Sequence, residues 1–563
     1  MRRARKSKHR RREGAEQTPA ESTRSEIVAG IQEILRERRA QPRSVERASI
    51  KGLPPYDPDA HGPLVRPASV EGYRPLEEYW VNEPFARVSI LHDPRLNRRM
   101  YYLSEPEVGR GGLRLLRRIM EFIKSRVPLE RGNLGEEELL ARKTVEFLNI
   151  TKTRASLPMI YKLFYYVKRD ALGFKRVDAL MRDPQIEDIS CNGLNVPVYI
   201  YHRRYFSLPT NIVFTDEEEL NGLVIYLVER CGKTISFGKP TVDGTLPDGS
   251  RLQATLGTEI TTRGSTFTIR KFAKEPFTPV HLIEYGTYTP EMLAYLWLAT
   301  ENRNNILIIG ETASGKTSTL NALALFIPPD SKIISLEETR ELTFYQENWV
   351  PSVTRSTIGE GGGITLYDLL LQALRQRPEC VVVGEIRGKE ALTLFQAMST
   401  GHTCYSTLHA SNIDEAINRL EGPPLSIPHN MLGALDIACF QSTVHIGKKR
   451  VRRVTSIVEI LGIDLETNSL KVQELYRWVP ERDEFEQLAS SAKLMEIAER
   501  RGVPYERVKE ELRNRARVLE FLHRHRVIDH ERFSAFMRLY HTSPEEVMSY
   551  ILSESEKGGS DSR

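Results

Sequence analysis

The sequence predicts an α/β fold in which a mainly parallel sheet is covered by helices on both faces. Short apolar, strand-like runs alternate with helical segments between about residues 291 and 461. Continuous apolar runs are typical of parallel strands that are buried on both faces of a sheet. The runs lie at residues 306–309, 332–336, 380–383 and 403–407.

The chain is expected to contain several domains, because 563 residues are more than one hydrophobic core normally supports. Apolar residues recur at helical spacing between Leu113 and Leu172, which predicts helices there. Short strand-like runs and turns follow, and prolines and glycines then mark a hinge. The expected parts are a basic disordered arm and Pro-rich linker at 1–75, a helix-rich N-terminal domain at 76–174, a smaller α/β middle domain at 175–275, a hinge at 276–290, the parallel-sheet domain at 291–461 and a helical C-terminal appendix at 462–563.

The composition favours a cytosolic protein that folds over most of its length. Hydrophobic residues make up 40% of the chain and charged residues 28%, which are ordinary values for soluble domains. No window approaches the 18 or more apolar residues of a membrane span, and no secretory signal is evident. The five cysteines are far apart and form no Cys-x-x-Cys pair, so free thiols are expected rather than disulfides or a zinc ribbon.

The first dozen residues are strongly basic, although the whole chain has a formal net charge of only +5. Two interpretations stay open. Such an arm makes a peripheral contact with anionic lipid headgroups, or a nonspecific one with nucleic acid, at about 1 kcal/mol per basic residue near a membrane. Alternatively, it is a solvated tail that improves solubility. The residues are Arg2, Arg3, Arg5, Lys6, Lys8, Arg10, Arg11 and Arg12.

Residues 310–317 match the Walker A pattern G-x-x-x-x-G-K-[ST], between an apolar strand and a helix-compatible segment. The glycines let successive N–H groups and the helix N-terminus point at phosphate oxygens. Lys316 adds a positive charge at the β and γ phosphates, and Thr317 is expected to ligate Mg²⁺. The sequence therefore predicts ATP and Mg²⁺ as ligands. The expected nucleotide-binding residues are Gly310, Glu311, Thr312, Ala313, Ser314, Gly315, Lys316, Thr317 and Ser318.

Acidic residues follow two of the other apolar runs. Glu385 ends the run at 380–383 and is a Walker B candidate, which would hold Mg²⁺ or orient the attacking water. Glu337 and Glu338 follow the run at 332–336 and land at the same edge of the sheet as the phosphate loop. One of the two is a candidate general base, and the sequence leaves open which.

Two histidines flank the strand at 403–407, His402 before it and His409 after it. In an extended conformation, the stretch from His402 to His409 spans roughly 23 Å, so the two histidines cannot share one metal ion. His409 lies at the carboxyl end of the strand, where it could sense a γ-phosphate. A purely structural role is the alternative for either histidine.

The middle domain offers Arg251, Arg263 and Arg270 shortly before the hinge. The period of two in residues 266–272 puts Phe267 and Ile269 on the core face and Arg270 on the other. A cation supplied from another domain would stabilise charge on the transferred phosphoryl group and make hydrolysis depend on domain closure. The alternative is that all three arginines are simply solvated.

Four ordered boxes resemble the secretion NTPase superfamily, which comprises the ATPases of type II and type IV secretion, type IV pili and the archaeal flagellum. They are the Walker A loop, the acidic box at 334–340, the segment from 373–378 through 385–387 and the histidine box at 400–409. The runs at 79–84, 247–272 and 347–349 look like the archaeal branch. The resemblance implies a RecA-like domain, and a homo-hexamer whose arginines Arg251, Arg263 and Arg270 contact the phosphates.

The sequence departs from that family in its acidic box, which commonly has Glu-Asp where this chain has Glu337-Glu338, and it lacks the four-cysteine zinc insert of bacterial type II members. We expect an ATP-hydrolysing motor that acts on a polytopic membrane platform protein at the cytoplasmic face of the membrane, with no specific nucleic acid. It would power secretion or assemble a pilus-like filament. A RecA-like nucleic-acid translocase and a nucleotide-gated scaffold are the alternatives.

Overall fold

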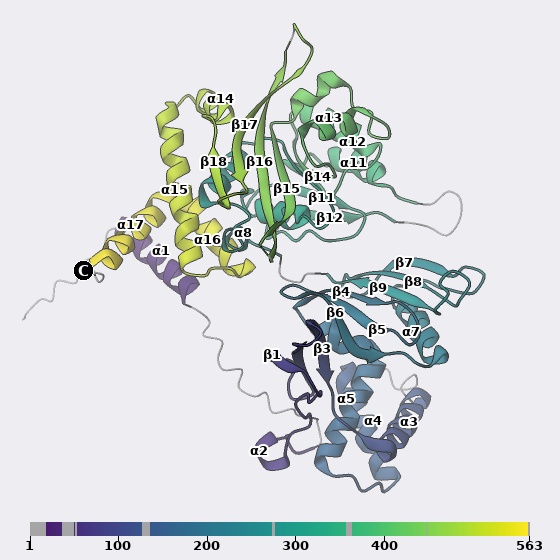
Figure 1. Ribbon diagram of the computed structural model, residues 1–563. Coiled ribbons are helices and arrows are strands. Elements are labelled where there is room, and N and C mark those ends of the chain that lie inside the picture. Colours follow the sequence, from purple (N-terminus) through teal and green to yellow (C-terminus); the bar gives the residue numbers. More distant parts are fainter. Residues whose placement is uncertain are drawn as a thin grey trace, which may run out of the picture. The chain divides into compact units, whose positions relative to one another are not determined.

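A computed structural model describes residues 19–36, 50, 53–126, 135–272, 276–355, 363–447, 449–464 and 466–560. The chain forms two compact units (Figure 1). Unit 1 comprises residues 1–37 and 274–563, and unit 2 comprises residues 38–273. The chain therefore starts in unit 1, passes through unit 2 and returns.

Unit 1 is built on a mixed sheet that has nine strands among the described residues. The strands, in spatial order, are β12 (Trp349–Val353), β11 (Ile333–Glu337), β13 (Cys380–Val383), β14 (Thr403–Leu408), β10 (Ile306–Gly310), β15 (Ile437–Ile446), β16 (Lys449–Ile463), β17 (Leu470–Val479) and β18 (Glu484–Gln487). The strands from β12 to β15 pair in parallel, and those from β15 to β18 pair in antiparallel fashion.

Both faces of the parallel part of this sheet are buried, as the apolar runs predict. Ile306 and Ile308 of β10 belong to one hydrophobic core, which also includes α9 (Pro290–Glu301) and α10 (Lys316–Ala324). Leu307 and Ile309 belong to a second core on the opposite face. That core is formed with α11 (Leu366–Leu374), α12 (Glu390–Ser399) and α13 (Ile413–Glu421). The predicted α/β class, with a mainly parallel sheet covered by helices on both faces, is confirmed.

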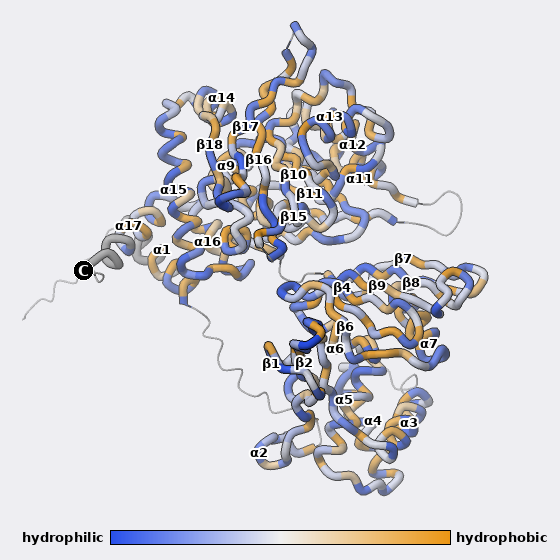
Figure 2. Tube along the Cα trace, viewed as in Figure 1, coloured by the Kyte–Doolittle hydropathy of each residue, from blue (hydrophilic) through white to orange (hydrophobic). Residues whose placement is uncertain are grey.

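The C-terminal part of unit 1 is helical only after the sheet ends, whereas the sequence predicted a helical appendix from residue 462. The strands β17 and β18 continue the sheet to Gln487, and the helices are α14 (Ala492–Arg501), α15 (Tyr505–Arg524), α16 (His530–Thr542) and α17 (Pro544–Ser560). Figure 2 shows how hydrophilic α15 is along much of its length. The charged composition of β17 and β18 hid their strand pattern, because these strands are partly exposed at the edge of the sheet.

The N-terminal region contains a helix, α1 (Pro19–Leu35), where the sequence predicted a disordered arm and linker. Its residues Ile27, Ile31 and Ile34 are buried in the core of unit 1, and Arg532 Nε donates to Ile34 O at 2.7 Å. Figure 1 shows α1 beside α16 and α17. The spacing of four and three residues between Ile27, Ile31 and Ile34 forms one apolar stripe along α1, which explains why this segment is a helix. The basic residues from Arg2 to Arg12 lie outside the described residues.

The expected hinge at 276–290 is part of unit 1. It contains α8 (Pro279–Glu284), whose residues Val280 and Leu282 are buried in the unit 1 core. Thr278 Oγ1 also donates to Ile528 O at 3.3 Å. Prolines mark the start of this helix and of α9, where their missing N–H is not needed, and this explains why they resembled a linker.

Unit 2 contains a second sheet, also of nine strands among the described residues. Its spatial order is β1 (Arg74–Asn82), β2 (Ala86–Asp93), β3 (Arg98–Ser104), β6 (Phe206–Val213), β5 (Pro197–His202), β4 (Ile186–Cys191), β9 (Thr266–Arg270), β8 (Arg251–Thr255) and β7 (Thr241–Thr245). Strands from both sides of the domain boundary predicted near residue 175 therefore belong to one sheet. Alternating buried residues such as Val88 and Ile90 mark the β1–β3 meander that the helical interpretation passed over.

The helices expected between residues 113 and 172 are present in unit 2. They are α3 (Gly109–Arg126), α4 (Glu136–Ile150) and α5 (Leu157–Ala171), which share a separate small core. The helices α6 (Asp178–Arg182) and α7 (Glu217–Arg230) pack on the sheet, whereas α2 (Pro58–His61) lies between residues of the small helical core. Among the residues that the structure describes, no helix of either unit has the length and apolar character of a membrane span.

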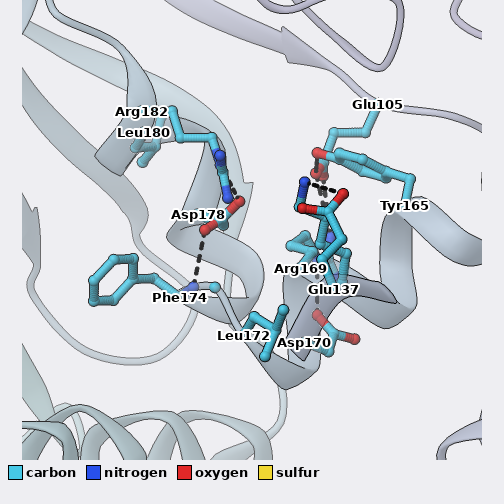
Figure 3. A network of polar contacts seen from close by, with 12 residues as sticks. Glu105, Glu137, Tyr165, Arg169, Asp170, Leu172, Phe174, Asp178, Leu180 and Arg182 are labelled. Atoms are coloured by element: carbon cyan, nitrogen blue, oxygen red, sulfur yellow. Dashed lines mark hydrogen bonds and ion pairs between the residues drawn. The ribbon is translucent and has the colours of Figure 1, made fainter. Parts of the chain in front are cut away.

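A polar network ties the helices of unit 2 to the end of its meander (Figure 3). Tyr165 of α5 donates to Glu105, the residue after β3, at 2.6 Å, and Arg169 pairs with Glu105 and with Asp170. The Glu105 and Asp170 charges outweigh the burial of the guanidinium and raise the pKa of Arg169. Arg169 therefore stays charged within the network.

A buried ion pair should be important for the stability of unit 1. Arg515 of α15 pairs with Glu301 at the end of α9, and its guanidinium lies 5.3 Å from the ring centre of Trp297. We expect Arg515→Ala to lower the free energy of unfolding by about 2 kcal/mol, because it leaves the poorly solvated carboxylate of Glu301 without its cationic partner and with only the Trp297 Nε1 donor. Arg507→Ala, at an exposed pair with Glu510, is the control. Equal urea-unfolding curves for the two variants would contradict this expectation.

Candidate functional site

The phosphate loop joins β10 to α10 and is curled by two residues in the left-handed region. Ala313 has φ 63° and Gly315 has φ 94°. Lys316 is buried, and its Nζ donates to the carbonyl oxygens of Gly310 and Glu311, each at 2.8 Å. The ammonium group therefore closes the loop on itself.

The floor of the loop is formed by Gln441 of β15, the parallel neighbour of β10. Gln441 Nε2 donates to Ser314 O at 2.8 Å, and its Oε1 accepts from Thr319 Oγ1 at 2.9 Å. A Cβ on Gly310 would lie 2.1 Å from Gln441 O, so only glycine fits there. The sequence analysis missed Gln441, whose one signal is a polar residue in an otherwise apolar strand.

A chain of polar contacts links the phosphate loop to the acidic residues. His409 Nδ1 lies 3.5 Å from Lys316 Nζ, and its Nε2 lies 2.9 Å from Glu385 Oε1. Arg387 Nη2 then donates to Glu385 at 2.5 Å, and its Nη1 to Glu338 at 3.2 Å. The structure thus brings together Lys316, His409, Glu385 and Glu338, as predicted from their strand-end positions, and adds Arg387, which the sequence analysis had not selected.

The surroundings of His409 favour the neutral form of its imidazole. Its partial burial, and secondarily the charge of Lys316, lower the pKa of His409 against the opposing effect of Glu385. A neutral ring accepts from Lys316 through Nδ1 and places Nε2 beside Glu385 Oε1, a buried oxygen that accepts no hydrogen bond among the described residues. His409 is therefore a connector between the ammonium and the carboxylate. His402, at the other end of β14, contacts Thr400 and is not part of this chain.

The two neighbouring glutamates of the acidic box have different surroundings. Glu337 is buried, and its Oε1 accepts from the backbone N–H groups of Glu341 and Leu342 at 2.8 and 2.9 Å. Its Oε2 is buried and has no hydrogen-bond partner among the described residues. Burial raises the pKa of Glu337 to about 7. Glu338 is exposed and paired with Arg387.

The donors near the loop suit a metal ion that is shared with phosphate. Among the described residues, no group of three or more His, Cys, Asp or Glu side chains could hold a metal ion by itself. Thr317 and Glu385 offer one hydroxyl and one carboxylate. Mg²⁺ is usually bound by one or two such groups together with water and substrate phosphates. These residues therefore fit Mg²⁺ that arrives with a nucleotide.

Arg251, Arg263 and Arg270 belong to unit 2, whereas the phosphate loop belongs to unit 1. All three are exposed. Arg251 on β8 and Arg270 on β9 are directly opposite each other, and Asp188 on β4 lies opposite Arg270 on its other side. Arg270 therefore has a cationic residue opposite it on one neighbouring strand and an acidic residue opposite it on the other.

A family model for type II/IV secretion system proteins matches residues 208–475, and one described as PilB3-like, N-terminal, matches residues 33–107. Two uncharacterised proteins of the archaeon Methanocaldococcus jannaschii are similar to this chain. One is 42% identical over 373 residues, which are 66% of this chain and 68% of the relative. The other is 46% identical over 245 residues, which are 43% of this chain and 91% of the relative.

Two solved structures are similar to parts of this chain. The VirB11 ATPase from the Brucella suis type IV secretion system, in complex with sulphate, is 23% identical, with coverage of 48% of this chain and 88% of that chain and a TM-score of 0.25. The pilus retraction motor PilT with bound ADP is 21% identical, with coverage of 50% and 81% and a TM-score of 0.36.

The surroundings of Glu337 predict a pH dependence of stability. Because its pKa in the folded protein, about 7, lies above the ordinary 4.5, the folded state holds the proton more tightly. Protonation of Glu337 therefore contributes to the free energy of unfolding. This contribution is complete below about pH 4.5 and is lost as the pH rises through about 7. From about pH 5 to pH 8, we expect the free energy of unfolding of wild type to fall by roughly 2–4 kcal/mol relative to that of Glu337→Gln, measured by urea unfolding.

The exposed neighbour provides the control for this experiment. Glu338→Gln removes the same charge one residue away and should leave the pH dependence of wild type unchanged. A free-energy difference between wild type and Glu337→Gln that stays constant across this pH range would contradict the account.

Proposed function

Since the chain belongs to the family of type II/IV secretion system proteins, in its archaeal branch, we propose that it is an ATP-hydrolysing motor of a secretion or pilus-like machine. The resemblance found in the sequence is thereby confirmed at the level of the family. The observation that carries the proposed activity is the contact chain from Lys316 through His409 to Glu385 beneath a curled phosphate loop.

In the proposed site, the loop residues 310–318 bind the phosphates through backbone N–H groups, and Lys316 moves its charge from the loop carbonyls to the β and γ phosphates. Thr317 and Glu385 hold Mg²⁺, which neutralises negative charge on the phosphates. His409 responds to the γ-phosphate through its contact with Lys316.

We assign the general base to Glu337. A base works best when its pKa is close to the ambient pH, and the raised pKa of Glu337, about 7, meets this condition. Its unpartnered Oε2 is an acceptor for a proton. Glu338 instead holds Arg387, and through it orients Glu385.

The complete motor, in this proposal, is a homo-hexamer that acts on a polytopic membrane platform protein at the cytoplasmic face of the membrane. In the proposed motor, Arg251, Arg263 and Arg270 supply positive charge that stabilises the transferred phosphoryl group. The family match does not favour the nucleic-acid translocase or the scaffold, and no specific nucleic-acid partner is proposed.

Replacement of the loop lysine tests the activity. We expect Lys316→Ala to lower ATP turnover at least roughly 100-fold, because it removes the cation that stabilises the phosphates. Phosphate release by the full chain is the measurement, with circular dichroism to check the fold. Lys471→Ala on exposed β17 is the control and should turn over like wild type. Unchanged hydrolysis by Lys316→Ala would refute the proposed function.

The arginines of unit 2 can be tested separately from the loop. We expect Arg263→Ala to lower kcat by roughly 10³-fold if it stabilises the transferred phosphoryl group, with a smaller effect on ATP affinity. Arg203→Ala is the matched control, because Arg203 lies in the same unit and pairs with Glu187 on the surface. Equal kcat values for wild type, Arg251→Ala, Arg263→Ala and Arg270→Ala would rule out this role.

A further inference from the structure

The hairpin of β15 and β16 runs past the phosphate loop and carries donors outside the Walker motifs. Its strands pair Thr443 with Arg452 and His445 with Arg450. Directly opposite residues, and residues two apart in one strand, share a face of a sheet. These four side chains therefore belong to one face of the hairpin, and two of them contact the loop.

The two contacts converge on one carbonyl group of the loop. Arg452 Nε donates to Ala313 O at 3.0 Å, and Thr443 Oγ1 donates to the same oxygen at 3.4 Å. Ala313 is in the left-handed region at φ 63°, which costs a non-glycine residue about 1 kcal/mol. The two donors offset this cost and fix the direction of the Ala313 carbonyl.

The side chain of Arg452 also packs on the next turn of the loop. A Cβ on Gly315 would lie 3.2 Å from Arg452 Cδ and 3.0 Å from Gln441 Nε2. Gln441 in turn holds the carbonyl of Ser314. Two successive carbonyl oxygens of the loop, at residues 313 and 314, are thus held by donors of the hairpin.

The strand that carries Arg452 is itself fixed. The next residue, Arg453, is buried and donates to both oxygens of Asp483, at 2.7 and 2.8 Å. Its Nη1 donates to Tyr285 O at 2.8 Å, and Val454 N donates to Thr287 O at 3.2 Å. Arg452 therefore projects from a rigid strand, which is what a residue that sets a loop conformation requires.

We propose that Arg452 is a positioning residue for the nucleotide phosphates. It keeps the Ala313 carbonyl turned into the hairpin, so that the loop offers N–H groups and no carbonyl oxygen to an anion. One of the five guanidinium N–H donors makes this bond, and the guanidinium has no other hydrogen bond or ion pair with the described residues. Its charge therefore also favours an anion at the loop. This inference rests on the proposed ATPase function.

The test compares Arg452→Ala with wild type in the full chain. Loss of a charge-assisted hydrogen bond should weaken the binding of Mg-ATP and Mg-ADP by about tenfold, measured by calorimetry. KM for ATP should rise by a similar factor while kcat changes little, because the contact is made equally in the ground state and the transition state. Arg452→Lys, which keeps a cationic donor, should restore part of the affinity.

The matched control is Arg450→Ala, which removes an equal charge from the same face of the same strand but no contact to the loop. Wild-type affinity is expected for this variant. Equal weakening in Arg450→Ala and Arg452→Ala would overturn the proposal in favour of general electrostatic attraction. Wild-type KM and nucleotide affinity in Arg452→Ala would also overturn it.

Two further variants keep the test decisive. If Arg452→Ala does not fold, Thr443→Val removes the second donor to Ala313 O, and unchanged nucleotide affinity in that variant would count against the proposal. Lys316→Ala separates the two levels of inference. Active wild type with inactive Lys316→Ala and unaffected Arg452→Ala would leave the ATPase proposal intact and refute only the role of Arg452.

Discussion

The site depends on the parallel alignment of four neighbouring strands, β11, β13, β14 and β10. Because these strands run in the same direction, their carboxyl ends meet at one edge of the sheet. That edge receives Glu337 from β11, Glu385 after β13, His409 after β14 and the phosphate loop after β10. Residues more than 90 positions apart in the chain, such as Lys316 and His409, come within 3.5 Å for this reason.

Burial then gives similar side chains different properties. Glu337 and Glu338 are neighbours, yet one is enclosed with a pKa of about 7 and the other is exposed and ion-paired. Lys316 is buried but satisfied by two carbonyl oxygens, so the loop keeps a desolvated cation at its centre. Charges in a low-dielectric surrounding interact more strongly than charges in water. An incoming phosphate would therefore interact strongly with such groups.

The sequence was sufficient for those features that depend on local patterns. The Walker A spacing, the apolar runs and the strand-end acids predict β10, β11, β13, β14 and the residues at their ends. It was not sufficient for Gln441, Arg387 and Arg452, because each acts through a contact made across strands or turns. The strands β1–β3 were missed next to a strong helical signal, and β17 and β18 because their polar, half-exposed residues resemble a charged helix.

The central claim is that the loop at 310–317 binds a nucleotide triphosphate together with Mg²⁺. The most direct measurement is calorimetric titration of the unmodified full chain with ATP, first with Mg²⁺ and then with the metal chelated. The account predicts saturable binding that is markedly tighter with Mg²⁺, because in the proposed site Thr317 and Glu385 would share the metal ion with the phosphates. No detectable binding, or an affinity that is the same with and without Mg²⁺, would contradict it.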